Sequence, residues 1–356
     1  MRRILILTIA TFAAAAAQAP AQSPGVLAEL PNESEVTALG ALAVVSVYDA
    51  QARGYRLTLV QPGKPPQPLP VAASPVPFDA DLGPAADGRA AVVYSRCANP
   101  RARPEGDCDL AMYVLGDAAE QPVASASSPE ASDYEPSLWR GRLAWVRAYP
   151  DGREIAYTRS LSAKGPSRRE PGLPTRNCEV LVDPGDCTTR ERHVTDLKLA
   201  GDRLAYIGGY TVRRQAGFAT QEVRLVDLRT QRSRRVALSI AGEGGQGYLG
   251  LSFAAGRLGW QRSCFGDPGG CIGRGAFRYR YAKDSYEFEP RYRSLTGFAL
   301  LDDGALGLDG RGELGDDPGD PKSPPCDDLR TEAKELTCPL IGFQPAWKPI
   351  VARRVR

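Results

Sequence analysis

Carboxylate residues placed just ahead of short apolar strands are the main candidates for chemistry in this sequence. A protonated and an ionised carboxyl group that flank a glycosidic bond can cleave it. The candidates, all near the start of an expected inner strand, are Asp79, Asp81, Asp133, Glu135 and Asp196. Asp133 and Glu135 lead, because they precede an inner strand and would face a central channel. Acids at strand ends also cap turns or stay solvated, so a structural role remains open.

Other chemistry-bearing patterns are sparse. The single histidine, His193, excludes metal sites that need several histidines and allows one Ser-His-Asp arrangement at most. Neither the Gly-x-Ser-x-Gly motif nor the Ser-x-Asp box of sialidase-like propellers occurs. The glycine-rich stretch 242–247 does not match a dinucleotide-binding fingerprint, and the acidic stretch 302–328 lacks the ligand spacing of an EF-hand-type calcium loop. We therefore expect neither a cofactor nor a metal.

The first 21 residues are expected to form a secretory signal peptide. A basic start is followed by an apolar run, Ile4 to Ala17, and by small residues that suit cleavage after Ala17 or Ala21. The alternative is a membrane anchor, but a span requires roughly twenty apolar residues. No later segment is apolar enough to cross a membrane. The expected location is secreted, periplasmic or in the cell envelope.

Charge gives little indication of a nucleic-acid partner. The formal net charge is +3, and removal of the signal peptide would bring it close to neutral. Such a balance argues against a general nucleic-acid role. The basic run 232–235 suits a solvated turn better than a polyanion site.

The eight cysteines fall into four close pairs. An even count in an exported chain suggests disulfides, and proximity favours the local pairing. Zinc is the alternative, but its sites favour cysteines two to four residues apart, a spacing absent here. The expected disulfides are Cys97 with Cys108, Cys178 with Cys187, Cys264 with Cys271, and Cys326 with Cys338.

Six similar apolar strands, most of them preceded by a glycine turn, recur along the chain. Their aligned positions, 48 to 61 residues apart, are Leu42, Ala90, Leu143, Leu204, Leu258 and Leu306. A repeat of this length with strand-type units indicates a β-propeller. We expect one all-β domain over residues 22–356 with six four-stranded blades, in which the apolar strand is the second. Residues 27–30 are candidates to close the ring by pairing with a last blade drawn from 340–351.

Three cysteine pairs are expected on loops of this ring. Cys97 would end a second strand and Cys108 would begin the third, and the pairs at 264–271 and 326–338 are placed similarly. Long loops fixed on one face of a propeller often form a binding surface. The alternative is that the disulfides only stabilise an exported fold.

The stretch 87–94, Asp-Gly-Arg-Ala-Ala-Val-Val-Tyr, resembles the repeat of TolB-like propellers, also described as WD-repeat-like. Residues 344–349 resemble the Pro-x-Trp opening of that repeat, and 136–145 is similar with a shorter turn. No repeat matches in full, and most lack the Trp-Ser-Pro-Asp-Gly core. The resemblance implies recognition outside the cytoplasm and carries over no catalytic residues.

The leading functional expectation is a non-enzymatic, exported propeller that binds a protein or envelope component through one face, as a monomer. The complete repeat, the export signal and the missing catalytic motifs favour this reading. The alternative is a carboxylate-dependent glycan hydrolase or lyase, and a third possibility is a structural module without a discrete ligand.

Peptide mapping without reduction should recover four local disulfides from the exported protein. Each bridge closes a short loop, and on the chain-entropy model it contributes roughly 2–3 kcal/mol. Free thiols in the exported protein would contradict the pairing.

Overall fold

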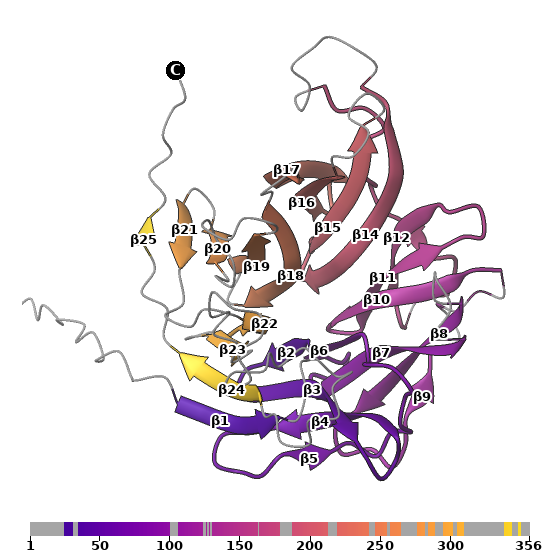
Figure 1. Ribbon diagram of the computed structural model, residues 1–356. Coiled ribbons are helices and arrows are strands. Elements are labelled where there is room, and N and C mark those ends of the chain that lie inside the picture. The colour runs from indigo at the N-terminus through magenta and orange to yellow at the C-terminus, as the bar shows by residue number, and fades with distance from the viewer. Residues whose placement is uncertain are drawn as a thin grey trace, which may run out of the picture.

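The strands form six antiparallel sheets arranged around a centre (Figure 1). The computed structural model describes residues 25–30, 35–99, 106–123, 126, 128, 130–162, 164–178, 187–212, 219–241, 246–254, 257–264, 276–281, 284–288, 295–301, 305–309, 338–343 and 348–349. Within these ranges all regular elements are strands. The all-β propeller predicted from the repeats is confirmed, and the six sheets agree with six blades.

The first three sheets follow one another along the chain. The first contains β2 (Val36–Leu39), β3 (Leu42–Asp49), β4 (Gly54–Val60) and β5 (Gln67–Pro68). The second contains β6 (Ala80–Pro84), β7 (Ala90–Asn99), β8 (Gly106–Val114) and β9 (Gln121–Pro122). The third contains β10 (Ser132–Trp139), β11 (Arg142–Ala148), β12 (Glu154–Ser160) and β13 (Arg168–Arg169).

The remaining sheets repeat the plan and close the ring. The fourth contains β14 (Thr189–Ala200), β15 (Arg203–Val212), β16 (Ala219–Asp227) and β17 (Arg232–Ala241). The fifth contains β18 (Gln246–Ala254), β19 (Arg257–Cys264), β20 (Ala276–Tyr281), β21 (Asp284–Phe288) and β25 (Lys348–Pro349). The sixth contains β22 (Leu295–Leu300), β23 (Ala305–Asp309), β24 (Cys338–Phe343) and β1 (Gly25–Leu30).

The start of the chain closes the ring, as expected. Strand β1 pairs with β24, with Leu30 opposite Cys338. The expectation for the other end was partly wrong, because β25 pairs with β21 and therefore extends the fifth sheet instead of the last. Strand β21 would otherwise be the edge of the fifth sheet. Its pairing with β25 satisfies backbone groups of both strands.

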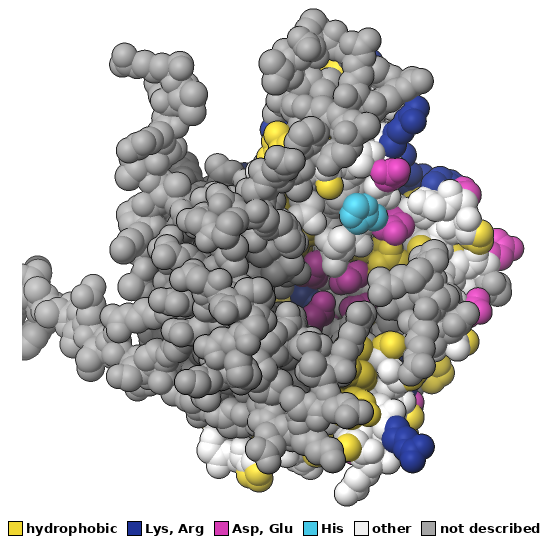
Figure 2. Space-filling view, viewed as in Figure 1, with side chains coloured by type: hydrophobic (Ala, Val, Ile, Leu, Met, Phe, Trp, Pro, Cys, Tyr) yellow, Lys and Arg dark blue, Asp and Glu magenta, His cyan; other side chains and the backbone are white. Residues whose placement is uncertain are grey.

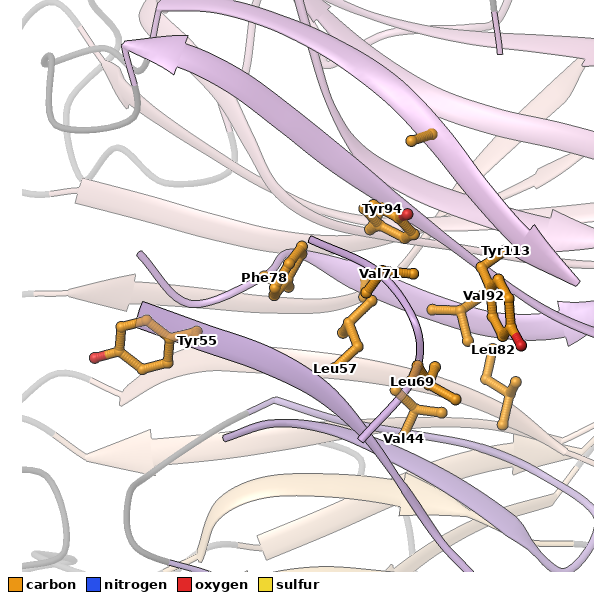
Figure 3. Close-up of a cluster of buried hydrophobic side chains, with 12 residues drawn as sticks. Val44, Tyr55, Leu57, Leu69, Val71, Phe78, Leu82, Val92, Tyr94 and Tyr113 are labelled. Carbon is orange, nitrogen blue, oxygen red and sulfur yellow. The ribbon is translucent and has the colours of Figure 1, made fainter. Parts of the chain in front are cut away.

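The hydrophobic core is divided among the interfaces between neighbouring sheets. The second strands are apolar on both faces, and Trp145 and Tyr94 are fully buried. Figure 3 shows the cluster between the first two sheets, in which Phe78 lies edge-on to the ring of Tyr94. A single blade cannot cover both of its faces, so contact with two neighbours supplies the buried apolar area.

The inner strands approach one another closely around the axis. A Cβ atom on Gly83 of β6 would lie 1.8 Å from the carbonyl oxygen of Leu138 in β10, so no side chain fits there. Side chains bridge these strands by accepting backbone N–H groups of the next blade. The bridges run from Leu82 N to Thr37 Oγ1 (2.8 Å), Leu138 N to Asp81 Oδ2 (3.1 Å), Leu199 N to Ser137 Oγ (2.8 Å), Leu251 N to Asp196 Oδ2 (2.5 Å) and Leu300 N to Ser252 Oγ (2.8 Å).

Two of the four predicted disulfides lie in the described residues, and both are confirmed. Cys97 and Cys108 face each other across β7 and β8, and Cys178 bonds Cys187 in the connection that leads to β14. Disulfides are typical of an oxidising environment such as the periplasm or the extracellular space. The predicted bridges at 264–271 and 326–338 each have one cysteine outside the described residues, and the predicted signal peptide lies wholly outside them. None of the described segments is a helix of the length and hydropathy needed to span a membrane.

Replacement of Ser137 by alanine should destabilise the propeller by about 1–3 kcal/mol. The fully buried hydroxyl donates to Asp81 (2.6 Å) and accepts from the backbone of Leu199, so its loss leaves two buried groups short of a partner. Urea denaturation measures the change. The exposed Ser162→Ala variant is the matched control and should stay within about 0.5 kcal/mol of the wild type. Equal stability of the two variants would contradict the proposed role of the bridge.

Candidate functional site

Four carboxylates occupy equivalent positions on four successive inner strands. The interblade bridges show which residues of successive blades are equivalent. The residue after Asp81, Ser137 and Lys198 donates its N–H to the preceding blade. Thr37, Asp81, Ser137 and Lys198 are therefore equivalent positions. Two residues earlier in each blade stand Glu35, Asp79, Glu135 and Asp196. Because inner strands of a propeller run in the same direction, equivalent positions lie at one level around the axis. We call these four residues the carboxylate ring.

The ring lies where the inner strands begin, at one mouth of the central channel. This is also the face that carries the β7–β8 hairpin loop and the connection before β14, and therefore both described disulfides. Figure 2 shows acidic side chains gathered around a basic one in the hollow at the centre of this face. The stapled loops and the carboxylate ring thus share one surface.

A backbone irregularity positions Glu135. Strand β10 has a bulge after Tyr134, where Glu135 and the following proline together oppose one residue of β11. Glu135 has φ +48°, a left-handed conformation that costs a residue with a side chain roughly 1–3 kcal/mol. Its N–H donates to Asp79 Oδ2 at 2.5 Å, which ties the two carboxylates to one local structure. Strained backbone of this kind is typical of functional sites.

Asp79 and Asp81 lie on the same strand region but have different partners. Asp79 also accepts from the hydroxyl of Ser95 at 3.0 Å. Asp81 accepts from the hydroxyls of Thr37 (2.9 Å) and Ser137 (2.6 Å) and is buried. Asp81 therefore joins three blades below the ring, whereas Asp79 belongs to the ring itself.

Lys198 is the cation at the centre of this cluster. Its Nζ lies 3.5 Å from Asp81 Oδ1 and 3.8 Å from Asp196 Oδ1, and its side chain is 13% exposed. Burial alone would lower the pKa of Lys198, but the charges of Asp81 and Asp196, together with the ring glutamates, raise it well above its usual range. The amine therefore stays protonated at all physiological pH values.

The ring carboxyl groups hold protons more tightly than ordinary carboxyl groups. Burial raises the pKa of Asp196 to about 7 and that of Asp79 to about 6, although Lys198 and hydrogen-bond donors oppose the rise. Glu35 keeps contact with solvent in the channel mouth, yet the surrounding protein raises its pKa to about 7. Burial raises the pKa of Glu135 well above its usual range, and the charges of Asp79 and Glu35 add to this effect.

The channel below the ring is narrow. A cavity of about 40 Å³ is lined by inner-strand residues that include Thr37, Asp81 and Lys198. This volume holds roughly three water molecules and is far too small for a sugar ring. Within the part of the chain that the structure describes, the buried Asp196 Oδ1 accepts no hydrogen bond, and it lies 3.8 Å from Lys198 Nζ. A ligand must therefore approach the ring from the face.

The two leading candidates, Asp133 and Glu135, have different environments. Glu135 joins the carboxylate ring, as do Asp79 and Asp196. Asp133 is fully buried, accepts a hydrogen bond from Trp145 Nε1 (3.0 Å) and pairs with Arg147 Nε (2.7 Å). These bonds join β10 to β11, and Asp133 lies outside the carboxylate ring.

The single histidine lies apart from the ring. His193 is exposed near the start of β14, and its ring lies over Gly209, where a Cβ atom would come within 2.3 Å of Nε2. Its Nδ1 lies 3.0 Å from the carbonyl oxygen of Glu191. No described contact links His193 to the four ring residues.

Glu35 and Lys198 are absent from the set predicted from the sequence. A repeated tetrad could have identified them: an acid, an apolar residue, a polar residue and a second apolar residue. The four copies are 35–38 (Glu-Val-Thr-Ala), 79–82 (Asp-Ala-Asp-Leu), 135–138 (Glu-Pro-Ser-Leu) and 196–199 (Asp-Leu-Lys-Leu). The third residue is neutral or acidic in the first three copies and is Lys198 in the fourth. This substitution places a cation among the carboxylates.

The ring does not have the geometry of a metal centre. Within the described ranges, no group of three or more His, Cys, Asp or Glu side chains is arranged to hold a metal ion. The positive charge of the Lys198 ammonium group offsets the negative charges of Asp81 and Asp196.

Stability should fall as the pH rises from about 5 to about 8. The folded-state pKa of Asp196, about 7, exceeds its ordinary value of 3.8, so the folded protein holds a proton that the unfolded chain has released. The resulting stabilisation is complete below the ordinary pKa and is lost as the pH rises through about 7. Asp196→Asn keeps the acceptor for Leu251 and should reduce this loss by about 1–3 kcal/mol.

Thermal and urea unfolding of the wild type and of Asp196→Asn at both pH values measure this difference. Asp227→Asn is the matched control. The Asp227 carboxylate accepts the backbone N–H of Thr230, which lowers its pKa, so it is ionised throughout the interval and its loss should not alter the pH dependence. A wild-type stability that rises toward pH 8 would contradict the assignment.

Comparisons with known proteins show likeness at the level of the fold. No family model matches the chain, and no curated protein sequence does. The solved structures that resemble it include an α-L-arabinanase of Penicillium chrysogenum complexed with arabinobiose, with 10% identity and a TM-score of 0.49 over 92% of this chain and 99% of that one. A polysaccharide lyase, an ulvan lyase of family PL25, has 8% identity and a TM-score of 0.45 over 80% of each chain.

The β-propeller domain of the Trilobed protease from Pyrococcus furiosus has 10% identity and a TM-score of 0.41, over 78% of this chain and 90% of that domain. The similar structures thus include propellers of glycan-cleaving enzymes and of a protease. At these identities the likeness concerns the fold, and the chemistry must be argued from the residues of this chain.

Proposed function

We propose that this protein cleaves a glycosidic bond at the carboxylate ring by general acid–base catalysis. The observation that carries the proposal is a pair of linked carboxyl groups with different proton affinities. Glu135 N–H binds Asp79 Oδ2, the pKa of Asp79 is about 6, and the pKa of Glu135 lies well above the usual range. At neutral pH the pair therefore offers one proton donor and one acceptor, as glycosidic hydrolysis requires.

Glu135 is the proposed acid and Asp79 the proposed base. In hydrolysis the Glu135 carboxyl proton moves to the leaving oxygen as the bond from the anomeric carbon to that oxygen breaks. Asp79 accepts a proton from the water that attacks the anomeric carbon. The Ser95 hydroxyl, at 3.0 Å, and the Glu135 N–H hold the Asp79 carboxylate in place and favour its ionised form.

Lys198 and Glu35 have separate roles beside this pair. The buried ammonium group of Lys198 limits the repulsion among the carboxylates and so allows one of them to remain ionised. Glu35 keeps contact with solvent at the channel mouth, where a substrate would arrive. The narrow cavity beneath Lys198 requires the glycan to lie across the face instead of threading the channel.

Ligand recognition without catalysis is the second candidate function. It is supported by the two disulfides on the face that carries the ring, because loops fixed in this way present a constant binding surface. The TolB-like repeat pattern and the expected export of the chain agree with recognition of a protein or envelope component. The two functions differ in one observable, the turnover of a glycan.

The purified mature protein should release reducing ends from at least one member of a panel of neutral and acidic polysaccharides. Glu135→Gln and Asp79→Asn should each lower the turnover by roughly 10²–10⁴-fold, because each removes one partner of the proton transfer. In Asp79→Asn the group that titrates is gone, so the acidic limb of the pH profile near pH 6 should disappear. An unsaturated product, detected by its ultraviolet absorption, would assign the reaction as an elimination.

Glu130→Gln is the matched control, because Glu130 is an exposed carboxylate in the same connection before β10. Its turnover should equal that of the wild type, and circular dichroism should show the same fold for all variants. Full activity in Glu135→Gln and Asp79→Asn would remove these residues from the mechanism. Failure to cleave any member of the panel would overturn the proposal in favour of recognition.

A further inference from the structure

A second cavity lies on the same face, between β12 and β14. Its volume is about 470 Å³, within the range of small-molecule sites. The floor is apolar and includes Ile155, Val194 and Tyr206, all of which are buried. The cavity is thus large enough for a sugar unit, unlike the channel beneath the carboxylate ring.

Arginines dominate the charged lining of this cavity, which includes Arg153, Arg169, Arg190 and Arg192. Arg153 is paired with Asp151 at 2.5 Å. Among the described residues, the other three form no ion pair, and all are exposed at the rim. Guanidinium groups present planar sets of donors that match carboxylate and sulfate oxygens.

The two carboxylates of the lining are already engaged within the protein. Glu154 Oε2 accepts the backbone N–H of Val194 at 2.6 Å, and Glu154 also binds the Tyr134 hydroxyl. Glu191 Oε2 accepts from the hydroxyl of Thr211 at 3.1 Å. These hydrogen bonds hold Glu154 and Glu191 in the wall of the cavity. The side chains of Arg169, Arg190 and Arg192 therefore remain available to a ligand.

The backbone brings two of these arginines to the same cavity. Strand β14 has a bulge after Arg190, and Glu191, between the two arginines, has φ +49°. In this left-handed conformation the strand departs from regular alternation, so the consecutive residues Arg190, Glu191 and Arg192 all line the cavity. A non-glycine residue rarely adopts it, so the fold maintains a strained backbone at a cluster of like charges.

The cavity is linked to the proposed catalytic pair through one side chain. Tyr134 precedes Glu135 in β10, and its hydroxyl binds Glu154 in the wall of the cavity. The carboxylate ring and this arginine cavity therefore lie next to each other and carry opposite charge. A chain molecule that crosses the face would meet both.

We propose that the arginine cavity is a subsite for an anionic sugar unit, a uronate or a sulfate ester, next to the bond that is cleaved at the carboxylate ring. The apolar floor would contact the ring of the sugar, and Arg169, Arg190 and Arg192 would bind its charged group. The inference rests on the proposed function for its place in a reaction, but anion binding itself does not require turnover.

Calorimetric titration of the Glu135→Gln protein tests the subsite without consumption of the probe. The probes are a galacturonate trisaccharide, its uncharged methyl ester, and a sulfated neutral trisaccharide. At least one anionic probe should bind at least about tenfold more tightly than the methyl ester, and high salt should weaken that binding. The better of the two anionic probes identifies the charged group.

Arg190→Ala/Arg192→Ala in the same background should weaken binding of the anionic probe by about tenfold or more. Arg229→Ala/Arg232→Ala removes two exposed arginines from the β16–β17 turn and is the charge-matched control, which should bind as its parent does. Equal binding of charged and esterified probes, or unchanged binding in Arg190→Ala/Arg192→Ala, would overturn the subsite. Anion binding without turnover would instead refute only the proposed function.

Discussion

Each inner strand of this propeller is a sheet edge buried at the axis, and the rest of the structure depends on how its backbone groups are satisfied. A buried N–H group without a partner is strongly unfavourable, and the neighbouring blade cannot provide a ladder. The molecule meets this constraint with side chains such as Thr37, Asp81 and Ser137, which accept an N–H from the next blade. Ring closure by β1 and β24 then fixes the number of blades that share this arrangement.

This constraint also explains where polar residues gather. The axis must carry polar side chains, and the carboxylates two residues before Thr37, Asp81, Ser137 and Lys198 add charge to the channel mouth. So many acids in a desolvated space would repel one another, and the molecule relieves the repulsion with Lys198 and with bound protons. The raised proton affinity that results is a property of the group and not of any one residue. It places acid and base forms together at neutral pH.

The face of the propeller is divided by charge. The carboxylate ring occupies the axis, and the arginine cavity lies outward between the third and fourth blades. Bulged inner strands are common to both, at Glu135 in β10 and at Glu191 in β14. A bulge turns a side chain out of the regular alternation, so these irregularities direct charged groups toward the face instead of the blade interface.

The sequence by itself determined the architecture, because the spacing of apolar strands and the local cysteine pairs depend on residues close in the chain. The second strands and the Cys97–Cys108 staple were therefore predictable. The acids at the strand starts were also visible, and three of the five joined the ring. Only the tertiary structure separated Glu135 from Asp133, which pairs with Arg147, and brought Lys198 to carboxylates more than a hundred residues away. The physical reason is that proton affinity and charge pairing depend on burial and on neighbours across blades, and these distances are set by closure of the ring.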